Sequence, residues 1–428
     1  MKNNRLSYVF SLGLILISFQ VQSIEINLNG VLGAEYTDNA RKSAVDEESD
    51  VKTTLAVNVG LNYEFKDLDA VVNYDIRYHD YDKDTQDDTK TINGDARVVF
   101  AQFKNKLVWR LSNSRRNIVR DKSLLDVQDN RQDRSITSIS PELTLNLTGS
   151  NALITNLKYS DISYEDSEDL DSERQGGVVS FRHLISKVDN LSLRLTYDDV
   201  TFGDDDADYE YTQAALIYST TLSRINYQLA LGINESSVDD EDVDGDYINA
   251  TVNYSHNGSE ISFDLNQQLT DPSQGNDNQF LLEGSQFDGL DTTLDVYERS
   301  SAGLRYSSDF ICESCNFSLG AVYIEEDFDN DIFDNDEYGV DVSFTYNLNS
   351  STSLGASAGY RDYTFDDESR FGFERNNYEL FFNTVFAKTL SLRAYVRMEE
   401  RDSDSGGTSF DESVIGFAAN YRFYSYAR

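Results

Sequence analysis

The sequence predicts an all-β protein, a transmembrane antiparallel β-barrel of about 20 strands, within a range of roughly 18–22. Its composition favours strands, because it holds 27 Tyr and 24 Phe but only 2 Pro. Apolar and polar residues alternate through segments of roughly ten residues, as in strands with one lipid-facing and one lumen-facing side. After residue 23 no apolar run approaches the roughly 18 residues that a membrane helix needs. A membrane protein without such helices must be a closed barrel, since lipid offers no partner to an open edge.

The first 23 residues predict a signal peptide. Lys2 and Arg5 form a charged start, residues 9–19 are an apolar stretch, and residues 21–23 offer a small-residue cleavage site. The alternative is an anchoring helix, but the segment is short and strand-like alternation begins at Ile24. We therefore expect a leader over 1–23 and a barrel over 24–428.

The charge of the chain limits its partners. A formal net charge of −40 excludes a nucleic-acid binder, because phosphates would be repelled. Acidity of this size is also typical of disordered chains. An aromatic content of 12% and the regular alternation argue against disorder.

The alternation is clear in segment 225–233. One face is apolar and the other is small or polar: Ile225, Tyr227, Leu229, Leu231 and Ile233 oppose Asn226, Gln228, Ala230 and Gly232. Segment 338–347 has the same pattern, with Val342 on the apolar face and Ser343 on the polar one. In a soluble sandwich the apolar face would pack on a second sheet. Here the opposite faces are polar almost throughout, which predicts a wet lumen.

About twenty such strands can be placed, with connections that alternate in length. They are expected to begin near residues 24, 51, 69, 92, 106, 135, 151, 175, 191, 209, 224, 247, 259, 293, 316, 337, 352, 376, 389 and 411. The long connections are 38–50, 115–133, 237–246, 271–292, 328–336 and 366–374. Short turns belong to the periplasmic rim and long loops to the exterior, so an even count puts both termini in the periplasm. Pro141 interrupts the sixth strand and predicts a bulge or a strand start there.

The last strand resembles the C-terminal signal of outer-membrane barrels, which the barrel assembly machinery reads. Ile415, Phe417, Ala419, Tyr421 and Phe423 alternate toward an aromatic end, and five further residues follow. The expected location is therefore the cell outer membrane, in contact with its lipid.

Three short motifs carry a family resemblance. They are Glu35-Tyr36-Thr37-Asp38-Asn39, Gln267-Gln268-Leu269-Thr270-Asp271-Pro272 and Asn420-Tyr421-Arg422-Phe423. With the strand pattern, they make the chain resemble the outer-membrane β-barrel porins found with exopolysaccharide and PEP-CTERM/exosortase loci. The resemblance implies an outer-membrane location and a link to surface polysaccharide or its export components. It implies no residue-level activity.

Cys312 and Cys315 lie in a predicted periplasmic turn. A Cys-x-x-Cys pair can be a redox dithiol, part of a zinc site or a haem attachment. Haem attachment needs His at position 316, where Asn316 stands, and no further zinc ligand is near in sequence. The periplasm is oxidising, so we expect a structural disulfide.

Asp240, Asp242 and Asp244 copy the first half of a calcium loop. The twelfth position is Thr251, where a bidentate Glu is expected. A solvated acidic loop is the plain interpretation, and weak surface binding of Ca²⁺ or Mg²⁺ is the functional alternative. We expect no resident metal and no cofactor.

Segment 111–134 differs from the other loops because it is both apolar and basic. Such a loop can fold into the lumen and pack there, although ordinary loop composition is the alternative. The bases expected at a constriction are Arg115, Arg116, Arg120 and Lys122. A second set of bases should line the pore: Arg77, Arg110, Arg194, Arg393 and Arg397. They are expected to form ion pairs with Asp75, Asp198 and Glu399, and the alternative is that they only brace the wall.

The function expected is a porin-like or secretion channel, since twenty strands exceed the 16–18 of porins that already hold an aqueous channel. The alternative is a non-conducting surface scaffold or receptor whose acidic loops contact polysaccharide, cations or a partner. Only three His occur, and no nucleophile and base lie together in the strand map, so we expect no enzyme.

Overall fold

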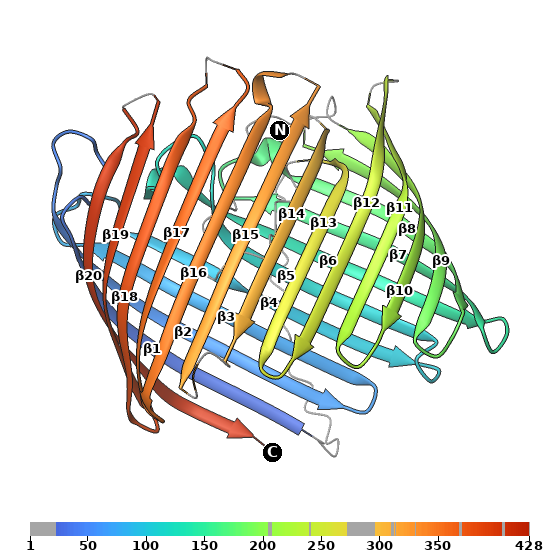
Figure 1. The fold of residues 1–428 in the computed structure, drawn as a ribbon, viewed down its shortest axis with the longest axis horizontal. Helices are drawn as coiled ribbons and strands as arrows, with labels where there is room; N and C mark the ends of the chain where they lie inside the picture. Colours follow the sequence, from blue (N-terminus) through green and yellow to red (C-terminus); the bar gives the residue numbers. More distant parts are fainter. Residues whose placement is uncertain are drawn as a thin grey trace, which may run out of the picture.

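The computed structural model is one closed β-barrel (Figure 1). It describes residues 23–203, 208–238, 241–271, 296–309, 312, 314–329, 331–367, 370–404 and 407–427. Each strand pairs antiparallel with its neighbours in the chain, and β20 pairs with β1 to close the ring. The predicted fold and the count of 20 strands are confirmed. Within the described residues, no helix is long and apolar enough to cross a membrane.

Within the described residues, the strands and three single-turn helices follow one another along the chain. They are β1 (Ser23–Thr37), β2 (Asp50–Phe65), β3 (Leu68–Tyr81), β4 (Thr89–Gln102), β5 (Leu107–Val119), η1 (Gln128–Asn130), β6 (Arg131–Asn146), β7 (Asn151–Tyr164), η2 (Glu168–Leu170), β8 (Ser172–Leu184), β9 (Asp189–Phe202), β10 (Tyr209–Thr221), β11 (Ile225–Val238), β12 (Glu241–His256), β13 (Ser259–Thr270), β14 (Tyr297–Ser308), β15 (Cys315–Phe328), η5 (Asp331–Phe333), β16 (Asn335–Asn349), β17 (Thr352–Phe365), β18 (Phe373–Ala387), β19 (Leu390–Ser403) and β20 (Phe410–Ala427).

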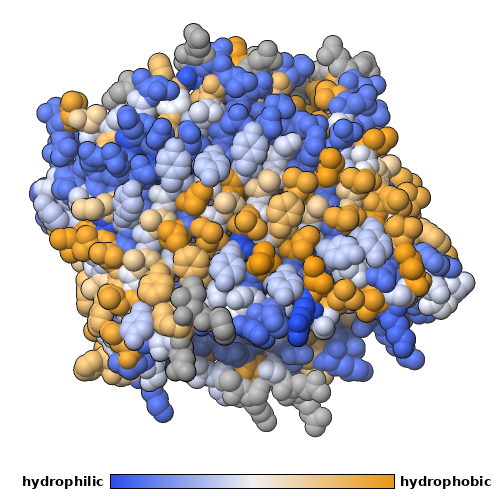
Figure 2. All heavy atoms as spheres, in the orientation of Figure 1, coloured by the Kyte–Doolittle hydropathy of each residue, from blue (hydrophilic) through white to orange (hydrophobic). Residues whose placement is uncertain are grey.

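Strand alternation sorts side chains between lipid and lumen. In β11, Leu229, Leu231 and Ile233 are exposed on the outer face, whereas Asn234 and Ser236 are buried on the inner face. Large apolar residues that stay exposed in a closed barrel can only meet lipid. Figure 2 shows apolar side chains gathered in a band across the wall, with hydrophilic residues above it.

The two rims of the barrel differ in their connections. The turns 66–67, 147–150, 257–258 and 350–351 are short, whereas 38–49, 120–130 and 165–171 at the other rim are longer. The start of β1 and the end of β20 lie at the short-turn rim (Figure 1). Both ends of the barrel therefore share the rim where the prediction put them. Most of the predicted leader, residues 1–22, lies outside the described residues.

Several predicted boundaries are wrong, because the strands extend beyond the segments in which apolar and polar residues alternate. The connection expected over 115–133 shrinks to 120–130, since β5 continues to Val119 and β6 begins at Arg131. The connection expected over 237–246 is also mostly strand, because β12 begins at Glu241. Backbone pairing continues where side chains turn polar, since the ladder needs only N–H and C=O groups.

Pro141 neither starts a strand nor makes a bulge. It lies inside β6 opposite Trp109 of β5. The ladder with β7 omits Ser140 and Pro141 but keeps the same register on both sides, from Ile139 opposite Tyr159 to Glu142 opposite Asn156. Because proline has no N–H, the ladder between β6 and β7 is interrupted at these two residues without a change of register. The predicted bulge is therefore wrong.

The face assignment can be tested at matched depth in β11. We expect Leu229→Arg to block assembly, because an arginine on the lipid face near the bilayer centre costs about 2–4 kcal/mol. Gln228→Arg, which points into the wet lumen, should assemble normally. The measurement is the fraction of heat-modifiable folded protein in lipid vesicles. Equal yields for the two variants would overturn the assignment of inner and outer faces.

Candidate functional site: a loop folded across the lumen

Residues 120–130 connect β5 to β6 and fold into the barrel; we call them the inward loop. Lys122 reaches Glu326 of β15, and Arg401 of β19 binds two loop carbonyls. In the closed ring of 20 strands, β15 stands ten places from β5 and so lies on the opposite wall. Figure 1 shows β5 and β6 in the far wall and β15 and β16 in the near wall. The inward loop therefore spans the interior of the barrel.

Asn130 holds the inward loop in shape. Its side-chain amide donates to the carbonyls of Asp121 and Leu125 at 2.8 and 3.0 Å. Its Oδ1 accepts the Asp121 N–H at 3.1 Å, and its backbone carbonyl accepts the Arg120 N–H at 2.7 Å. Only 4% of Asn130 is exposed, so these bonds are shielded from water. These hydrogen bonds within the loop hold its shape independently of its contacts with the barrel wall.

The first wall contact is an ion cluster around Glu326. Its Oε2 lies 3.2 Å from Lys122 Nζ, and its Oε1 lies 3.1 Å from Arg299 Nε of β14. Asn335 of β16 donates to Oε2 at 3.3 Å. Glu326 is 1% exposed. A carboxylate buried so deeply needs full pairing, and one of its two cations comes from the inward loop.

The second wall contact is an ion cluster around Asp126. Arg131 Nε lies 2.6 Å from Asp126 Oδ1, and Arg375 Nη2 of β18 lies 4.0 Å from Oδ2. Arg375 also pairs with Glu399 of β19 at 2.7 Å, which in turn binds Lys42 at 3.0 Å. The loop 38–49 that carries Lys42 thus joins the same network.

The charges around Asp126 fix its ionisation. Burial opposes the charged form, but Arg131 and Lys42 outweigh it and lower the pKa of Asp126 to about 2. A lowered pKa means that the ion cluster is complete above the ordinary carboxyl pKa of about 4. Its contribution is lost as pH falls through about 2. The inward loop is therefore held throughout the neutral range.

Arg401 forms the third contact, a clamp on the tip of the loop. Its Nη1 donates to the Leu124 carbonyl at 2.7 Å and its Nη2 to the Ser123 carbonyl at 2.6 Å. Its guanidinium carbon lies 3.8 Å from the centre of the Phe373 ring. The rigid fork of arginine suits two neighbouring acceptors, so this side chain fixes orientation as well as distance.

Neighbouring loops brace the inward loop from one side. Gln86, in the connection between β3 and β4, accepts the Gln128 N–H at 3.0 Å. The same Gln86 donates through its amide nitrogen to the carbonyl of Ala40. Three successive loops at the long-loop rim are thus joined by hydrogen bonds.

The four bases predicted for the constriction have different positions. Lys122 crosses the lumen, as expected of an inward loop. The prediction for Arg115 is wrong, because this residue lies in β5 on the outer face and pairs with Asp133 at 2.7 Å. The prediction for Arg116 is also wrong, because this residue belongs to the wall strand β5 and pairs with Asp95 at 2.8 Å. Arg120 begins the inward loop with an exposed side chain that makes no ion pair among the described residues.

The sequence prediction missed the residues that receive the loop. Glu326, Arg375 and Arg401 come from three strands that are far from the loop in the chain. One signal was available: Ile324, Glu326 and Phe328 continue the inner face of β15 into a segment that looked like acidic loop. No sequence signal links Glu326 to Lys122, because their contact joins positions 204 residues apart.

The bases predicted to line the pore are all on luminal positions, with mixed partners. Arg77 pairs with Asp75 as predicted, Arg110 pairs with Glu142 and Arg393 with Glu379. In the described part of the chain, Arg194 and Arg397 form no ion pair. Glu399 and Asp198, two of the predicted partners, bind none of these five bases there.

Outside the lumen, carboxylates gather on the outer face near the long-loop rim; we call them the acidic belt. Adjacent strands place like charges directly opposite one another, in the pairs Asp161–Glu173, Asp199–Glu210, Glu235–Asp244, Glu325–Asp336, Asp362–Glu374 and Glu400–Asp411. Such pairs are unfavourable in a sheet. The acidic belt concentrates negative charge where the wall leaves the apolar band.

The candidate cation residues that the structure describes lie in a strand and not in a loop. Asp242 and Asp244 belong to β12 and have exposed side chains, so the acidic loop expected there is wrong, and Asp240 lies outside the described residues. Extended strand cannot wrap around an ion as a turn does. Among the described residues no three His, Cys, Asp or Glu side chains are grouped to hold a metal ion.

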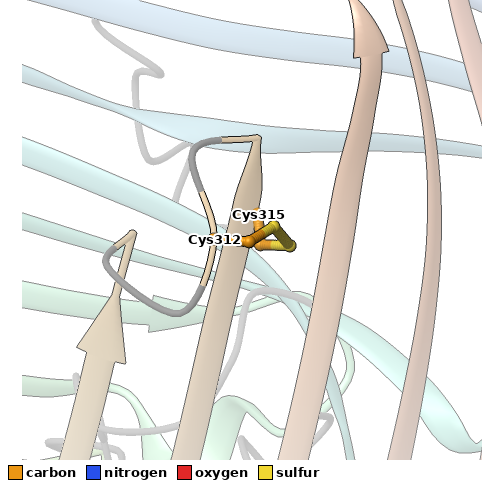
Figure 3. Close-up of a disulfide and its surroundings, with 2 residues drawn as sticks. All are labelled: Cys312 and Cys315. Atoms are coloured by element: carbon orange, nitrogen blue, oxygen red, sulfur yellow. A yellow bond between two sulfur atoms is a disulfide. The ribbon is translucent and has the colours of Figure 1, made fainter.

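The two cysteines form a disulfide at the short-turn rim (Figure 3). Cys315 is the first residue of β15, and its N–H donates to the Cys312 carbonyl at 3.1 Å. The adjoining Ser314 carbonyl accepts the Asn347 N–H of β16 at 2.7 Å. The bond thus closes the turn that leads into β15, where the sequence predicted it.

Comparisons with known proteins concern the fold. No protein-family model matches the chain, and no curated protein matches it. Among solved structures, it is similar to OccK1 (OpdK) of Pseudomonas aeruginosa, with a TM-score of 0.40, 10% identity, and coverage of 94% of this chain and 99% of that one. The FrpB iron transporter of Neisseria meningitidis gives a TM-score of 0.45 at 10% identity, covering 93% and 82%. OccAB2 of Acinetobacter baumannii gives 0.40 at 12%, covering 94% and 98%.

The location follows from the architecture. A closed antiparallel barrel with an apolar outer band, short turns at one rim and longer loops at the other is the outer-membrane type. The chain is therefore a β-barrel of the outer membrane.

The disulfide can be tested in protein taken from cells. We expect Cys312 and Cys315 to resist alkylation in unfolded, non-reduced protein and to react fully after reduction. The reason is that export exposes the pair to an oxidising compartment before the turn folds. Mass spectrometry of the labelled turn peptide measures both states. Two free thiols before reduction would refute the bond.

Proposed function

We propose that this barrel is a channel for small polar solutes, which pass beside the inward loop. The observation that carries the proposal is the loop itself, which is ion-paired to the wall opposite its own strands. A barrel of this strand number is wide enough to hold water along its axis. An unplugged lumen of that width would leak, and a fixed loop narrows it at one level.

The rest of the described lumen supports a hydrated path. Two polar hollows of about 670 and 450 Å³ lie on its wall. Asparagine is the most frequent residue of their lining, including Asn27, Asn58 and Asn73 in the first and Asn383 and Asn420 in the second, and the first is also lined by charged residues such as Asp95 and Arg116. Uncharged amides bind water and solute hydroxyls without holding ions tightly. Such a surface suits passage of polar molecules.

The charge distribution suggests the selectivity of the channel. Many charges of the described lumen are paired, whereas the rim connection 82–88 carries four exposed acids, Asp82, Asp84, Asp87 and Asp88, against one base. A mouth lined by one sign of charge concentrates counter-ions. We infer a preference for cations or neutral solutes over anions.

A link to exopolysaccharide export remains part of the proposal. Its support is the resemblance of the motifs at 35–39, 267–272 and 420–423 to porins found with polysaccharide loci. Under this proposal the solute that passes is a saccharide or a small ion that accompanies it.

Replacing residues 121–129 with a short Gly-Ser linker should raise single-channel conductance by about twofold or more, because the free cross-section of the lumen grows. The strands stay intact, since the replacement ends before Arg131. The replacement removes one base, Lys122, but three acids, Asp121, Asp126 and Asp129, so it should also weaken cation preference. Planar-bilayer recordings measure both quantities.

Matched point variants show whether wall contacts hold the loop. Arg401→Ala removes the clamp and should increase conductance or its fluctuations, while Arg120→Ala, an exposed base of the same loop, should change neither. Heat-modifiable migration confirms that each variant is folded. If the linker variant is folded and conducts like the wild type, the inward loop is not the constriction.

The acidic belt favours a second function, a surface that contacts cations or a cationic partner. Like charges directly opposite cost up to about 1 kcal/mol per pair, so a divalent cation should stabilise the barrel by screening them. We expect millimolar Mg²⁺ to raise the unfolding temperature in detergent, and the double variant Asp199→Asn/Glu210→Gln to respond less. NaCl of equal ionic strength is the control. An equal effect of NaCl would show general screening and remove this second function.

A further inference from the structure

A polar cavity lies on the luminal face of β8 to β13, apart from the strands β14 to β19 that receive the inward loop. Its volume is about 180 Å³, and its wall includes Asp198, Tyr211, Gln213, Tyr247 and Gln268. These residues belong to four strands, β9, β10, β12 and β13. The cavity therefore borders the part of the lumen that the loop contacts do not occupy.

Two glycines allow close packing beside the cavity. Gly176 of β8 stands beside Asp198 in register, and a Cβ there would collide with the Asp198 carboxylate. Gly232 of β11 stands opposite Tyr247, where a Cβ would collide with the backbone of β10. Tyr247 packs on Ala215 and Ala230, which are buried and small. The sequence places small residues around two large polar ones.

The cavity holds polar groups with unused hydrogen-bonding capacity. Within the described part of the chain, the Asp198 carboxylate, the Tyr247 hydroxyl and the Gln268 amide make no hydrogen bond or ion pair. Gln213 donates to the Tyr211 hydroxyl at 3.0 Å, which leaves that hydroxyl free to donate. Together these groups offer both donors and acceptors around one small volume.

The adjoining polar groups are committed to one another. Arg174 Nη2 lies 2.5 Å from Asp271 Oδ2, and the Tyr209 hydroxyl donates to the same oxygen at 2.6 Å. Asp271 is 1% exposed. This buried trio forms a rigid edge of the cavity and leaves ligand recognition to the free groups.

The local charges cancel. Arg174 is paired with Asp271, and the positive charge of Lys158 in β7 attracts the carboxylate of Asp198 in β9. A neutral ligand with several hydroxyls fits this balance better than an ion. The two tyrosine rings add flat apolar faces, which suit the C–H groups of a sugar ring.

We propose that this cavity is a binding subsite for a neutral sugar unit. Tyr211 and Tyr247 contact the ring, and Asp198 and Gln268 accept or donate hydrogen bonds to its hydroxyls. The inference rests on the proposed channel function, because it places a sugar on the path beside the inward loop. It names the class of solute that the lumen favours.

The test uses maltotriose as a neutral probe and the full-length protein in detergent. Isothermal titration calorimetry should detect binding to the wild type. Asp198→Ala and Tyr211→Ala should each weaken it by about tenfold, the value for one lost charged hydrogen bond or ring contact. Tyr211→Phe keeps the ring and should lose less. Gln268→Ala serves if the tyrosine variant fails to fold.

Asp264→Ala is the matched control, because Asp264 is a luminal carboxylate on β13 that accepts the Thr251 hydroxyl at 2.8 Å and does not line the cavity. It should bind the probe like the wild type. No binding to the wild type, or equal weakening by Asp198→Ala and Asp264→Ala, would overturn the subsite.

Bilayer recordings separate the subsite from the channel. Binding with current blocks that Tyr211→Ala shortens supports both. Binding in calorimetry without any conductance keeps the subsite and removes the channel. Conductance without binding keeps the channel and removes the subsite.

Discussion

Every feature of this protein depends on the pairing of β20 with β1. Lipid contains no water to satisfy backbone N–H and C=O groups, so an open edge at membrane depth would cost several kcal/mol per group. The ladder runs from Glu25 opposite Ala427 to Thr37 opposite Val414, with one irregularity at Leu28 and Asn29. Once the ring is closed, strand number fixes its width, and alternation fixes which side chains face the enclosed space. The lumen and the inward loop exist only because that edge is sealed.

Closure also separates two electrostatic environments. Inside the long-loop end, buried charges meet opposite charges, as Glu326 meets Lys122 and Arg299. On the outer face at the same end, Asp199 stands opposite Glu210. Low dielectric makes an unpaired charge costly inside, whereas water at the outer rim tolerates like charges. The acidic belt therefore keeps like charges at the outer face, whereas the ion clusters of the inward loop pair opposite charges.

Predictions from local pattern succeeded where the backbone alone decides, and failed where distant strands decide. The period of two placed twenty strands, and Cys312 with Cys315 placed a disulfide, because both depend on neighbours in the chain. Arg115 looked like loop because it is charged, yet β5 continues through it. Asp242 and Asp244 copied a calcium motif, yet β12 extends them. Polarity marks where strands leave the membrane; it does not mark where they end.

Two of the three motifs that suggested a family contain buried residues, among them Thr37, Asn39 and Asp271, whereas Tyr421 and Phe423 of the third are exposed. Thr37 donates to Glu412 at 2.7 Å, and Asn39 binds the carbonyls of Ser43 and Asp411 at 2.9 Å. Asp271 joins Arg174 across the lumen wall. These contacts hold loops against the inside of the barrel, which is a structural role. A function is therefore better argued from the loop and the cavity than from these motifs.

The sequence by itself determined the class of the protein, the number and sidedness of its strands, the disulfide and the unusual character of one loop. These follow from alternation, composition and spacing, which act over a few residues. Only the tertiary structure decided that Lys122 meets Glu326, that Arg401 clamps the loop tip, and that Gly176 leaves room for Asp198. Those contacts join strands up to half a ring apart, and ring closure brings them together at positions that no local pattern encodes.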